Sequence, residues 1–344
     1  MGKRITVLGA GAWGTAFGQV LADAGNAVTM WAKEPEIVEG IRDHHHNGVR
    51  LPSVEKLPEN MTATGDRAEA VKDADIIVVA IAAQFARVAL VEFKDLIPGD
   101  AIVVSLMKGI ERGTSKRMDE VVREALDLPA DRFAAISGPN LSKEIADRQP
   151  AATVVACVNI DHARTVAEAC TTSYFKAFVS TDVIGLEMCG SLKNVVALAV
   201  GMARGAGYGE NTASMIETRG LAELTALGQA AGADPKTFAG LAGVGDLIAT
   251  CGSPLSRNYT FGSNLGKGLS VEEATKVSNG VAEGVPTTDA VVALGDELGV
   301  PTPLAYAMSR VLSEGLSCKE MLAQLFGGDI TEERGRRPAC EVLT

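Results

Sequence analysis

Short runs of apolar, often β-branched residues alternate with longer amphipathic segments through the first half of this chain. Segments such as 66–72 and 116–126 have the spacing of apolar residues and the charge that helices show. Several of the short runs are apolar on both faces, as a sheet covered by helices on both sides requires. This alternation predicts βαβ units and a mostly parallel, doubly wound α/β sheet. The runs predicted as strands are residues 5–8, 27–31, 76–80, 101–105, 133–137, 153–156 and 174–179.

The pattern changes from about residue 184, where alanine, leucine and glycine dominate and strand-like runs disappear. Asp234 followed by Pro235 is typical of a helix N-cap with proline at the first helical position. The second half therefore predicts an all-helical C-terminal domain, with a boundary between 180 and 190. We divide the chain into domains of residues 1–187 and 188–330, followed by a charged, flexible tail at 331–344.

A glycine-rich turn joins the first predicted strand to the first predicted helix. Gly9 allows a tight turn, Gly11 lets a ligand approach the backbone, and Gly14 brings helix and strand close together. The free N–H groups of the first helical turn then face an anion such as a pyrophosphate. Such a glycine pattern also occurs as a purely structural turn, but the strand–turn–helix context favours a dinucleotide-binding domain of the Rossmann type.

Composition and charge narrow the possible partners. The 344 residues exceed the usual size of one core, which supports two domains. A formal charge of −11 argues against a nucleic-acid or anionic-membrane surface. Any anionic substrate must therefore be bound by locally placed lysine and arginine side chains.

Cysteine, histidine and hydropathy give no sign of a metal site, a disulfide framework or a membrane span. The six cysteines are scattered, which predicts buried thiols in a reducing cytosol. His44, His45 and His46 lie in a polar stretch that we interpret as a solvated loop. The first strand leaves no room for a signal peptide, and the apolar stretch 195–203 is too short to cross a bilayer. We expect a cytoplasmic protein.

Polar residues follow two of the predicted strands at their carboxyl ends, where open α/β sheets bind ligands. Lys108 follows the strand at 101–105, and Gly138 and Asn140 follow the strand at 133–137. Each has an ordinary alternative, a surface lysine in the first case and a simple loop in the second.

Two further clusters lie in the helical half. Lys193 interrupts an apolar helix near the domain junction, where burial would lower its pKa toward the range of a proton donor, unless the side chain reaches the surface. Asp246 lies in a glycine-rich apolar segment. Shortly after it, Ser256, Arg257 and Asn258 supply hydrogen-bond donors suited to a phosphate.

Taken together, these motifs resemble the bacterial NAD(P)-dependent glycerol-3-phosphate dehydrogenase family over residues 5 to about 326. No single motif is decisive, but the set in this order is specific. The motifs are GAGAWGTA at 9–16, KG at 108–109, SGP at 137–139, LKN at 192–194, TRGLAE at 218–223, GVGDL at 243–247, SRN at 256–258 and EG at 283–284.

The resemblance implies a role for each matching residue, with Lys193 transferring the proton and no metal taking part. It implies that the cofactor is bound by Gly9, Gly11, Ala12, Trp13, Gly14, Lys33, Lys108, Ser142, Arg257, Val281 and Glu283. It implies that the substrate is bound by Lys108, Gly138, Asn140, Lys193, Asp246, Ser256, Arg257 and Asn258.

The implied activity is the interconversion of dihydroxyacetone phosphate and sn-glycerol 3-phosphate for glycerophospholipid synthesis, in a homodimer without stable membrane insertion. The cofactor is NADPH or NADH. Lys33 would neutralise a 2′-phosphate and favours NADPH, whereas Glu34 would repel it. Asn140 and Ser191 depart from the residues usual in the family, Ser or Thr and Ala respectively.

Two other functions fit parts of the pattern. A β-hydroxyacid or 6-phosphogluconate-type dehydrogenase shares the two-domain plan and a catalytic lysine, but its site needs a partner for a substrate carboxylate. A non-catalytic dinucleotide sensor would need neither Lys193 nor the cluster at 256–258.

Overall fold

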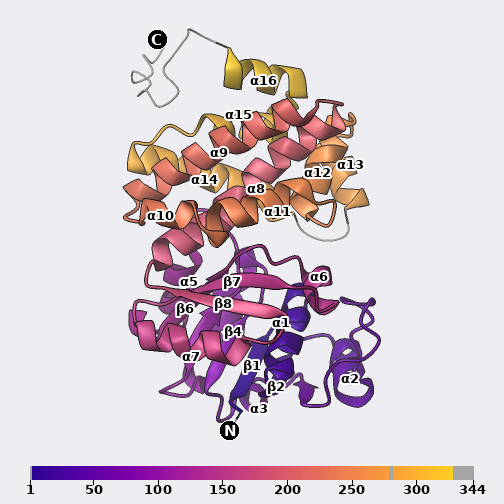
Figure 1. Ribbon diagram of the computed structural model, residues 1–344, viewed down its shortest axis with the longest axis vertical. Coiled ribbons are helices and arrows are strands. Elements are labelled where there is room, and N and C mark those ends of the chain that lie inside the picture. Colours follow the sequence, from indigo (N-terminus) through magenta and orange to yellow (C-terminus); the bar gives the residue numbers. More distant parts are fainter. Residues whose placement is uncertain (1, 279–281, 328–344) are drawn as a thin grey trace.

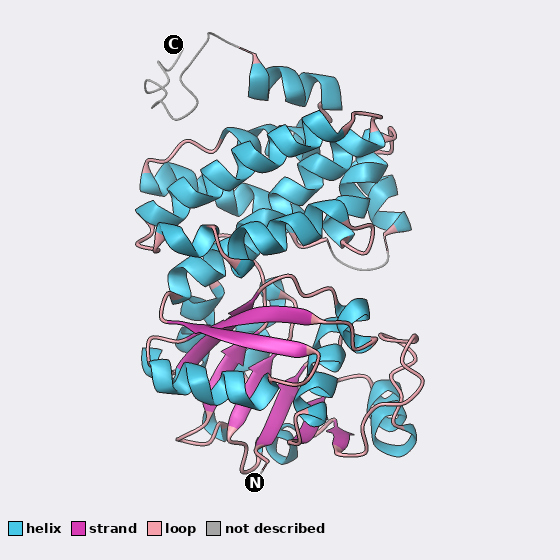
Figure 2. Cartoon of the chain, viewed as in Figure 1, coloured by secondary structure: helices cyan, strands magenta, loops and turns pink. Residues whose placement is uncertain are grey.

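The computed structural model describes residues 2–278 and 282–327 of the chain. A sheet-containing half and a helical half are stacked along the long axis (Figure 1), and the strands are confined to the first of these (Figure 2). The sheet has the order β3-β2-β1-β4-β5-β6-β7-β8, and every described pair of neighbours is parallel except β6 and β7. Its strands are β1 (Arg4–Leu8), β2 (Ala27–Trp31), β3 (Met61–Thr64), β4 (Ile76–Val79), β5 (Ile102–Ser105), β6 (Phe133–Ser137), β7 (Ala151–Ala156) and β8 (Phe175–Ser180).

Alternating side chains of the strands build a separate hydrophobic layer on each face of the sheet. In β4, Ile76 and Val78 join one buried cluster, while Ile77 and Val79 join the other. Both faces of the strand are thus buried, which explains why its sequence is a continuous apolar run. One cluster includes side chains of α1 (Ala12–Asp23), α2 (Pro35–His44), α6 (Ser142–Ala146) and α7 (Ile160–Cys170); the other includes those of α3 (Arg67–Val71), α4 (Ala86–Val91) and α5 (Met118–Leu126).

Helix α8 (Val183–Gly205) forms the centre of the helical half. It is long and apolar enough to cross a membrane by length and composition, but 94% of its apolar window is buried inside the protein. The stretch 195–203 therefore belongs to a longer apolar helix than the sequence pattern indicated. Around it lie α9 (Glu210–Ala230), α10 (Pro235–Phe238), α11 (Asp246–Gly252), α12 (Arg257–Gly266), α14 (Gly284–Leu298) and α15 (Pro303–Glu314). Helix α13 (Val271–Val277) packs on α12, and α16 (Cys318–Phe326) packs on α15.

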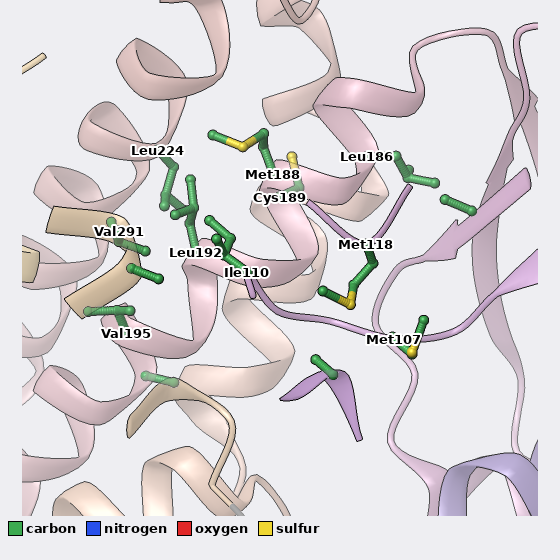
Figure 3. Close-up of a cluster of buried hydrophobic side chains, with 14 of the residues drawn as sticks. Met107, Ile110, Met118, Leu186, Met188, Cys189, Leu192, Val195, Leu224 and Val291 are labelled. Carbon is green, nitrogen blue, oxygen red and sulfur yellow. The ribbon is translucent and has the colours of Figure 1, made fainter. Parts of the chain in front are cut away.

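The two halves share a hydrophobic core. Met107 and Met118, from the sheet half, belong to the same buried cluster as Leu186 and Leu192 of α8 (Figure 3). Helix α8 begins at Val183, so the expected division at 187/188 falls within its first turns. The halves are therefore fixed to each other through the helix that carries Lys193.

Helices α8 and α12 approach each other through glycines on both helices. A Cβ atom at Gly262 would lie 2.0 Å from the carbonyl oxygen of Leu198, and one at Gly201 would lie 2.1 Å from that of Tyr259. Gly205 and Gly266 show the same crowding against the facing backbone. Since real Cβ atoms do not come this close to a carbonyl oxygen, only glycine permits this helix spacing.

The structure confirms the strands expected from sequence and adds one. Strand β3 was not predicted, because it has only four residues and two of them are threonines, so that it contains no apolar run. The cap expected at Asp234 is confirmed, since its carboxylate accepts a hydrogen bond from the backbone of Lys236 at 2.9 Å.

The expectations for the cysteines and for the histidine run at 44–46 are met only in part. The five described cysteines are free and buried, whereas Cys340 and the expected tail lie outside the described residues. The interpretation of the histidine run as a solvated loop was wrong in part. His44 ends α2 and is exposed, but His45 and His46 are half-buried. The ring of His46 is held against the chain, since its Nδ1 lies 2.8 Å from the Val54 carbonyl oxygen.

The glycine contact between α8 and α12 can be tested by adding a single methyl group. We expect Gly262→Ala to lower the free energy of unfolding by about 1–3 kcal/mol, because the methyl group forces the two helices apart. Gly252→Ala in α11 is the matched control, since a Cβ atom there meets nothing within 4 Å. Urea unfolding of both variants measures the difference, and equal stability of the two would contradict the packing argument.

Candidate active site

Lys193 lies in the middle of α8, and its side chain is only 6% exposed. Its Nζ donates hydrogen bonds to Asp246 Oδ1 at 2.5 Å and to Thr250 Oγ1 at 2.6 Å. Both acceptors come from α11, where Thr250 follows Asp246 by one helical turn and donates to the same carboxylate oxygen at 3.1 Å. The lysine is therefore buried with partners and does not reach the surface.

A second lysine shares this carboxylate. Lys108 Nζ lies 2.7 Å from Asp246 Oδ2 and 3.2 Å from the carbonyl oxygen of Gly138. Asp246 thus holds one ammonium group from the sheet half and one from the helical half, with its own side chain 2% exposed. One negative charge faces two positive charges, which leaves the cluster suited to an anionic ligand.

Burial and mutual charge set the proton affinities of this cluster. Burial, and to a smaller extent the charge of Lys108, lower the pKa of Lys193 to about 8 against the opposing effect of Asp246. Burial acts to raise the pKa of Asp246, but the two lysines outweigh it and hold that pKa below its ordinary value. Lys193 thereby has the proton affinity of a group that can release a proton near neutral pH.

The local structure around these side chains depends on close approaches of the chain. A Cβ atom at Gly190 would lie 2.9 Å from Ser137 Oγ and 3.3 Å from Lys108 Cγ, so this glycine lets α8 pass beside the lysine. Asp246 begins α11 directly after a π-helical turn, η4 (Leu241–Gly245). Wide turns of this type are frequent at functional sites.

The glycine turn has the geometry expected of it. Gly9 has φ +112°, and a Cβ atom there would lie 2.5 Å from the Ala80 carbonyl oxygen. A Cβ atom at Gly14 would lie 2.2 Å from the carbonyl oxygen of Gly9, whereas one at Gly11 meets nothing within 4 Å. Ala12 and Trp13 then form the first residues of α1, and the Trp13 ring lies 5.4 Å from that of Phe17. The turn leaves open space in front of the N-terminus of α1.

Asn47, which follows the histidine run at 44–46, holds this turn in place through hydrogen bonds. Its buried amide donates to the carbonyl oxygen of Ala10 at 3.0 Å and to Thr15 Oγ1 at 2.8 Å. No local sequence pattern indicates this residue, because its contacts span more than thirty positions.

Lys33 and Glu34 lie at the end of β2, as expected. Lys33 lines a groove of about 310 Å³ together with Glu39, Arg42 and the backbone of Gly65. Glu34 instead pairs with Arg50, at 3.3 Å between Nη2 and Oε1. Arg50 is a second residue that no local sequence pattern indicates.

Several expected ligand-binding side chains make hydrogen bonds within the protein. Asn258 donates to Asn194 Oδ1 at 2.9 Å and accepts from the Gly284 backbone at 2.8 Å. Asn140 Oδ1 accepts from Thr153 Oγ1 at 2.9 Å, and Ser256 caps α12. These contacts fix the orientation of each side chain.

The remaining candidates lie at helix ends. Arg257 is exposed at the first position of α12, and its charge acts on Glu283, the N-cap of α14. Ser142 begins α6, and Val281 lies outside the described residues. Within the described ranges 2–278 and 282–327, no group of three or more histidine, cysteine or acidic residues is arranged to hold a metal ion.

Comparisons with known proteins agree over nearly the whole chain. Residues 4–163 match the family model described as NAD-dependent glycerol-3-phosphate dehydrogenase N-terminus, and residues 182–323 match the corresponding C-terminus. The chain is 88% identical over 333 residues to glycerol-3-phosphate dehydrogenase [NAD(P)+] of Bifidobacterium longum strain NCC 2705, covering 97% of this chain and 100% of the relative. It is 49% identical to the protein of the same name from Corynebacterium kroppenstedtii over 96% of this chain and 99% of that one. A crystal structure of glycerol-3-phosphate dehydrogenase from Coxiella burnetii superposes with a TM-score of 0.89 at 33% identity, covering 95% and 99% of the two chains.

The shared carboxylate can be tested by removing its charge. We expect Asp246→Asn to lower the free energy of unfolding at pH 7 by about 3–5 kcal/mol, because the buried ammonium group of Lys193 and the half-buried one of Lys108 lose their counter-charge. The pKa of Lys193 should also fall below its present value of about 8. A lysine whose pKa is lower in the folded than in the unfolded state destabilises the fold fully below its folded-state pKa, and this penalty disappears as the pH rises from that value toward the unfolded-state pKa.

The variant should therefore begin to gain stability at a lower pH than the original chain, which gains only above about pH 8. Urea unfolding between pH 6 and 9 measures both profiles, with the exposed Asp296→Asn as the control. Parallel profiles for Asp246→Asn and the original chain would show that the carboxylate does not set the charge state of Lys193.

Proposed function

The chain belongs to the NAD-dependent glycerol-3-phosphate dehydrogenase family, and on that premise we propose that it interconverts dihydroxyacetone phosphate and sn-glycerol 3-phosphate with NADPH or NADH. The observation that carries the proposal is the buried lysine whose charge is balanced by a carboxylate shared with a second lysine. Reduction of a ketone needs a proton donor at the developing alkoxide and positive charge beside it. The cluster of Lys193, Asp246 and Lys108 supplies both.

The described residues fit a dinucleotide. The turn of Gly9, Gly11 and Gly14 leaves open space beside the N-terminus of α1, where backbone N–H groups suit a pyrophosphate. Ala12, Trp13, Lys33, Lys108, Ser142, Arg257 and Glu283 are the further residues that we assign to the cofactor. When bound, the nicotinamide cofactor supplies or takes up a hydride.

Lys193 holds the proton for the ketone oxygen. In the direction of reduction its Nζ donates to the oxygen as negative charge develops there, and in the reverse direction it takes up the alcohol proton. Lys108 lies on the other oxygen of Asp246 and stabilises the same developing charge. Asp246 and Thr250 hold the Lys193 ammonium group in place.

We assign the substrate phosphate to the N-terminus of α12. Arg257 is exposed at the first position of this helix, and Ser256 is its N-cap. A planar guanidinium beside free backbone N–H groups suits a phosphate dianion. Gly138, Asn140 and Asn258 complete the substrate site in this proposal, with Asn140 and Asn258 fixed by their internal hydrogen bonds.

We propose a preference for NADPH on the basis of the charges at the end of β2. Glu34 is paired with Arg50, which reduces the repulsion that its carboxylate would exert on a 2′-phosphate. Lys33 lines the adjacent groove, and no ion pair of Lys33 within 4.0 Å is found among the described residues. Of the two side chains, Lys33 is therefore the one that we expect to face the ribose.

In the cell, we propose that this enzyme supplies the glycerol phosphate backbone of membrane lipids as a cytoplasmic homodimer without stable membrane insertion. The burial of α8 in the protein core supports the absence of membrane insertion, and the free state of the described cysteines is consistent with a reducing compartment.

The role of Lys193 has a direct test. We expect Lys193→Ala to lower the turnover number by about 10²–10⁴-fold, because the ketone oxygen loses its proton donor. Fluorescence titration should show nearly unchanged NADPH binding, since the lysine acts on the substrate. The control is Lys236→Ala, an exposed lysine in α10.

The same assignment fixes the pH dependence. Only the protonated lysine can donate, so the rate of ketone reduction in the original chain should fall as the pH rises through about 8. Near-normal turnover of Lys193→Ala, or a reduction rate that stays level to pH 9, would remove Lys193 from the mechanism.

Cofactor preference has a separate test. We expect Lys33→Ala to weaken NADPH binding much more than NADH binding, because only NADPH carries the 2′-phosphate that the ammonium group attracts. High salt should narrow the difference between the cofactors in the original chain, since it screens exposed charges. Equal losses for NADPH and NADH in Kd measurements would mean that Lys33 does not recognise the 2′-phosphate.

A further inference from the structure

Glu187 is a buried acid on α8 that does not belong to the cluster of Lys193, Asp246 and Lys108. Only 5% of the residue is exposed, and its Oε2 atom has no hydrogen-bond partner among the described residues. It precedes Lys193 on the same helix. A carboxyl group at such a position is costly, so its presence calls for a physical reason.

The carboxyl group of Glu187 faces the beginning of α5. Helices α5 and α8 pack against each other, and Met118 and Leu186 belong to the same buried cluster (Figure 3). The backbone N–H of Met118, the first residue of α5, acts on the Glu187 carboxyl group as a hydrogen-bond donor. The first N–H groups of a helix have no acceptor within that helix. Glu187 thus supplies an acceptor to α5 from another helix.

The beginning of α5 is also the end of the loop that carries Lys108. This loop, residues 106–117, leaves β5 and turns back on itself, because Ile110 and Arg117 form an antiparallel bridge. Ile110 follows Lys108 by two positions, and Arg117 directly precedes α5. The bridge therefore links the position of α5 to that of Lys108.

Helix α8 contacts this loop at both of its ends. At the first end, a Cβ atom at Gly190 would lie 3.3 Å from Lys108 Cγ. At the second end, Glu187 meets the backbone of Met118. Positions 187 and 190 are three residues apart and so share one face of the helix. The helix that carries Lys193 thus also holds the loop that carries Lys108.

The surroundings of Glu187 keep its carboxyl group protonated. Burial raises the pKa of Glu187 well above its ordinary value, and the charges of Asp119 and, to a smaller extent, Glu120 add to this effect. Arg117 and the Met118 N–H act in the opposite direction but do not offset it. The Arg117 guanidinium is already paired with Asp119, at 2.9 Å between Nε and Oδ1. A neutral carboxyl group can accept the Met118 N–H without placing an unpaired negative charge in the core.

We propose that Glu187 is a positioning residue for the reaction: by holding the beginning of α5 against α8, it keeps Lys108 on the carboxylate of Asp246. The inference rests on the proposed function, because the role of Lys108 in stabilising the developing charge does. Glu187 acts in its neutral form and touches neither substrate nor cofactor.

The test uses the effect of Lys108 on the proton affinity of Lys193. The Lys108 charge lowers the pKa of Lys193, so that pKa should rise above about 8 when Lys108 is displaced. Glu187→Met keeps the approximate size of the side chain but removes the acceptor. We expect it to move the pH at which ketone reduction falls upward by about one pH unit. The KM for dihydroxyacetone phosphate should rise roughly 3- to 10-fold.

Two further variants are the controls. Glu187→Gln keeps a neutral group of the same shape that can accept the Met118 N–H, so its pH profile and KM should match those of the original chain. Ser191→Ala removes another buried polar side chain of α8, whose hydroxyl donates to the Glu187 carbonyl oxygen at 2.9 Å. It should leave the midpoint of the pH profile at about 8, whatever it costs in stability.

The midpoint of Lys193 can also be measured without turnover. In an NMR titration of protein that carries isotope-labelled lysine, the Lys193 resonance is the one missing from Lys193→Ala. Thermal unfolding confirms that each variant is folded. If Glu187→Met does not fold, Glu187→Ala is measured in the same way.

The neutral form of Glu187 has a separate signature. A carboxyl group whose pKa is higher in the folded than in the unfolded state destabilises the fold progressively as the pH rises from about 4.5 toward the folded-state value. Glu187→Gln does not titrate. Its free energy of unfolding in urea should therefore increase relative to that of the original chain between about pH 4.5 and 7.

The outcomes separate the two levels of the argument. A Lys193 midpoint that stays or falls in Glu187→Met, or that rises equally in Glu187→Gln, would overturn the positioning role. A constant stability difference between Glu187→Gln and the original chain would overturn the neutral form. Failure of the original chain to reduce dihydroxyacetone phosphate with NADPH or NADH would instead refute the proposed function, while the NMR midpoints would still test the link between Glu187 and Lys108.

Discussion

The arrangement of the active site depends on one buried carboxylate that two lysines share. Asp246 binds Lys108 from the sheet half and Lys193 from the helical half, through different oxygens. Burying either ammonium group without a partner would be costly, and a single carboxylate cannot neutralise both. The cluster therefore joins the two halves and keeps an excess of positive charge where an anionic substrate is expected.

This charge cluster is possible because glycines on α8 let neighbouring parts of the chain approach its backbone closely. Gly190 lets the Lys108 side chain and Ser137 lie against the helix, while Gly201 and Gly205 let α12 do the same further along. Through α12, the hydrogen bonds of Asn258 to Asn194 and to the Gly284 backbone carry the position of α8 to the beginning of α14. The positions of the side chains assigned to proton transfer, phosphate binding and cofactor binding therefore all depend on the position of α8.

The polar groups in and around the site differ in how much the protein itself satisfies them. Asn140, Asn258 and Thr250 are paired internally, so a ligand meets side chains already fixed in orientation. Glu187, in contrast, keeps an unpaired buried oxygen beside the beginning of α5. Prearranged donors and acceptors such as the three paired side chains cost little reorganisation when the ligand arrives, which is how enzymes obtain strong interactions from few contacts.

The sequence by itself determined the parts that local pattern encodes. Apolar runs buried on both faces gave the strands apart from short β3, and the spacing of Gly9, Gly11 and Gly14 after a strand gave the dinucleotide turn. Lys193 and Asp246 stood out because a charged residue inside an apolar segment is costly without a partner. The assignment of a role to each candidate depended on family resemblance, which the comparisons support at the level of the family.

Only the tertiary structure decided which charges meet. Nothing in the sequence places Asp246 between Lys108 and Lys193, pairs Glu34 with Arg50, or brings Asn47 behind the glycine turn. These contacts join positions between 16 and 138 residues apart. Hydrophobic periodicity records which face of an element is buried, but it does not record which element lies opposite. The proton affinity of Lys193 and the contact of Glu187 with α5 follow from that packing, and so they could be found only in the folded chain.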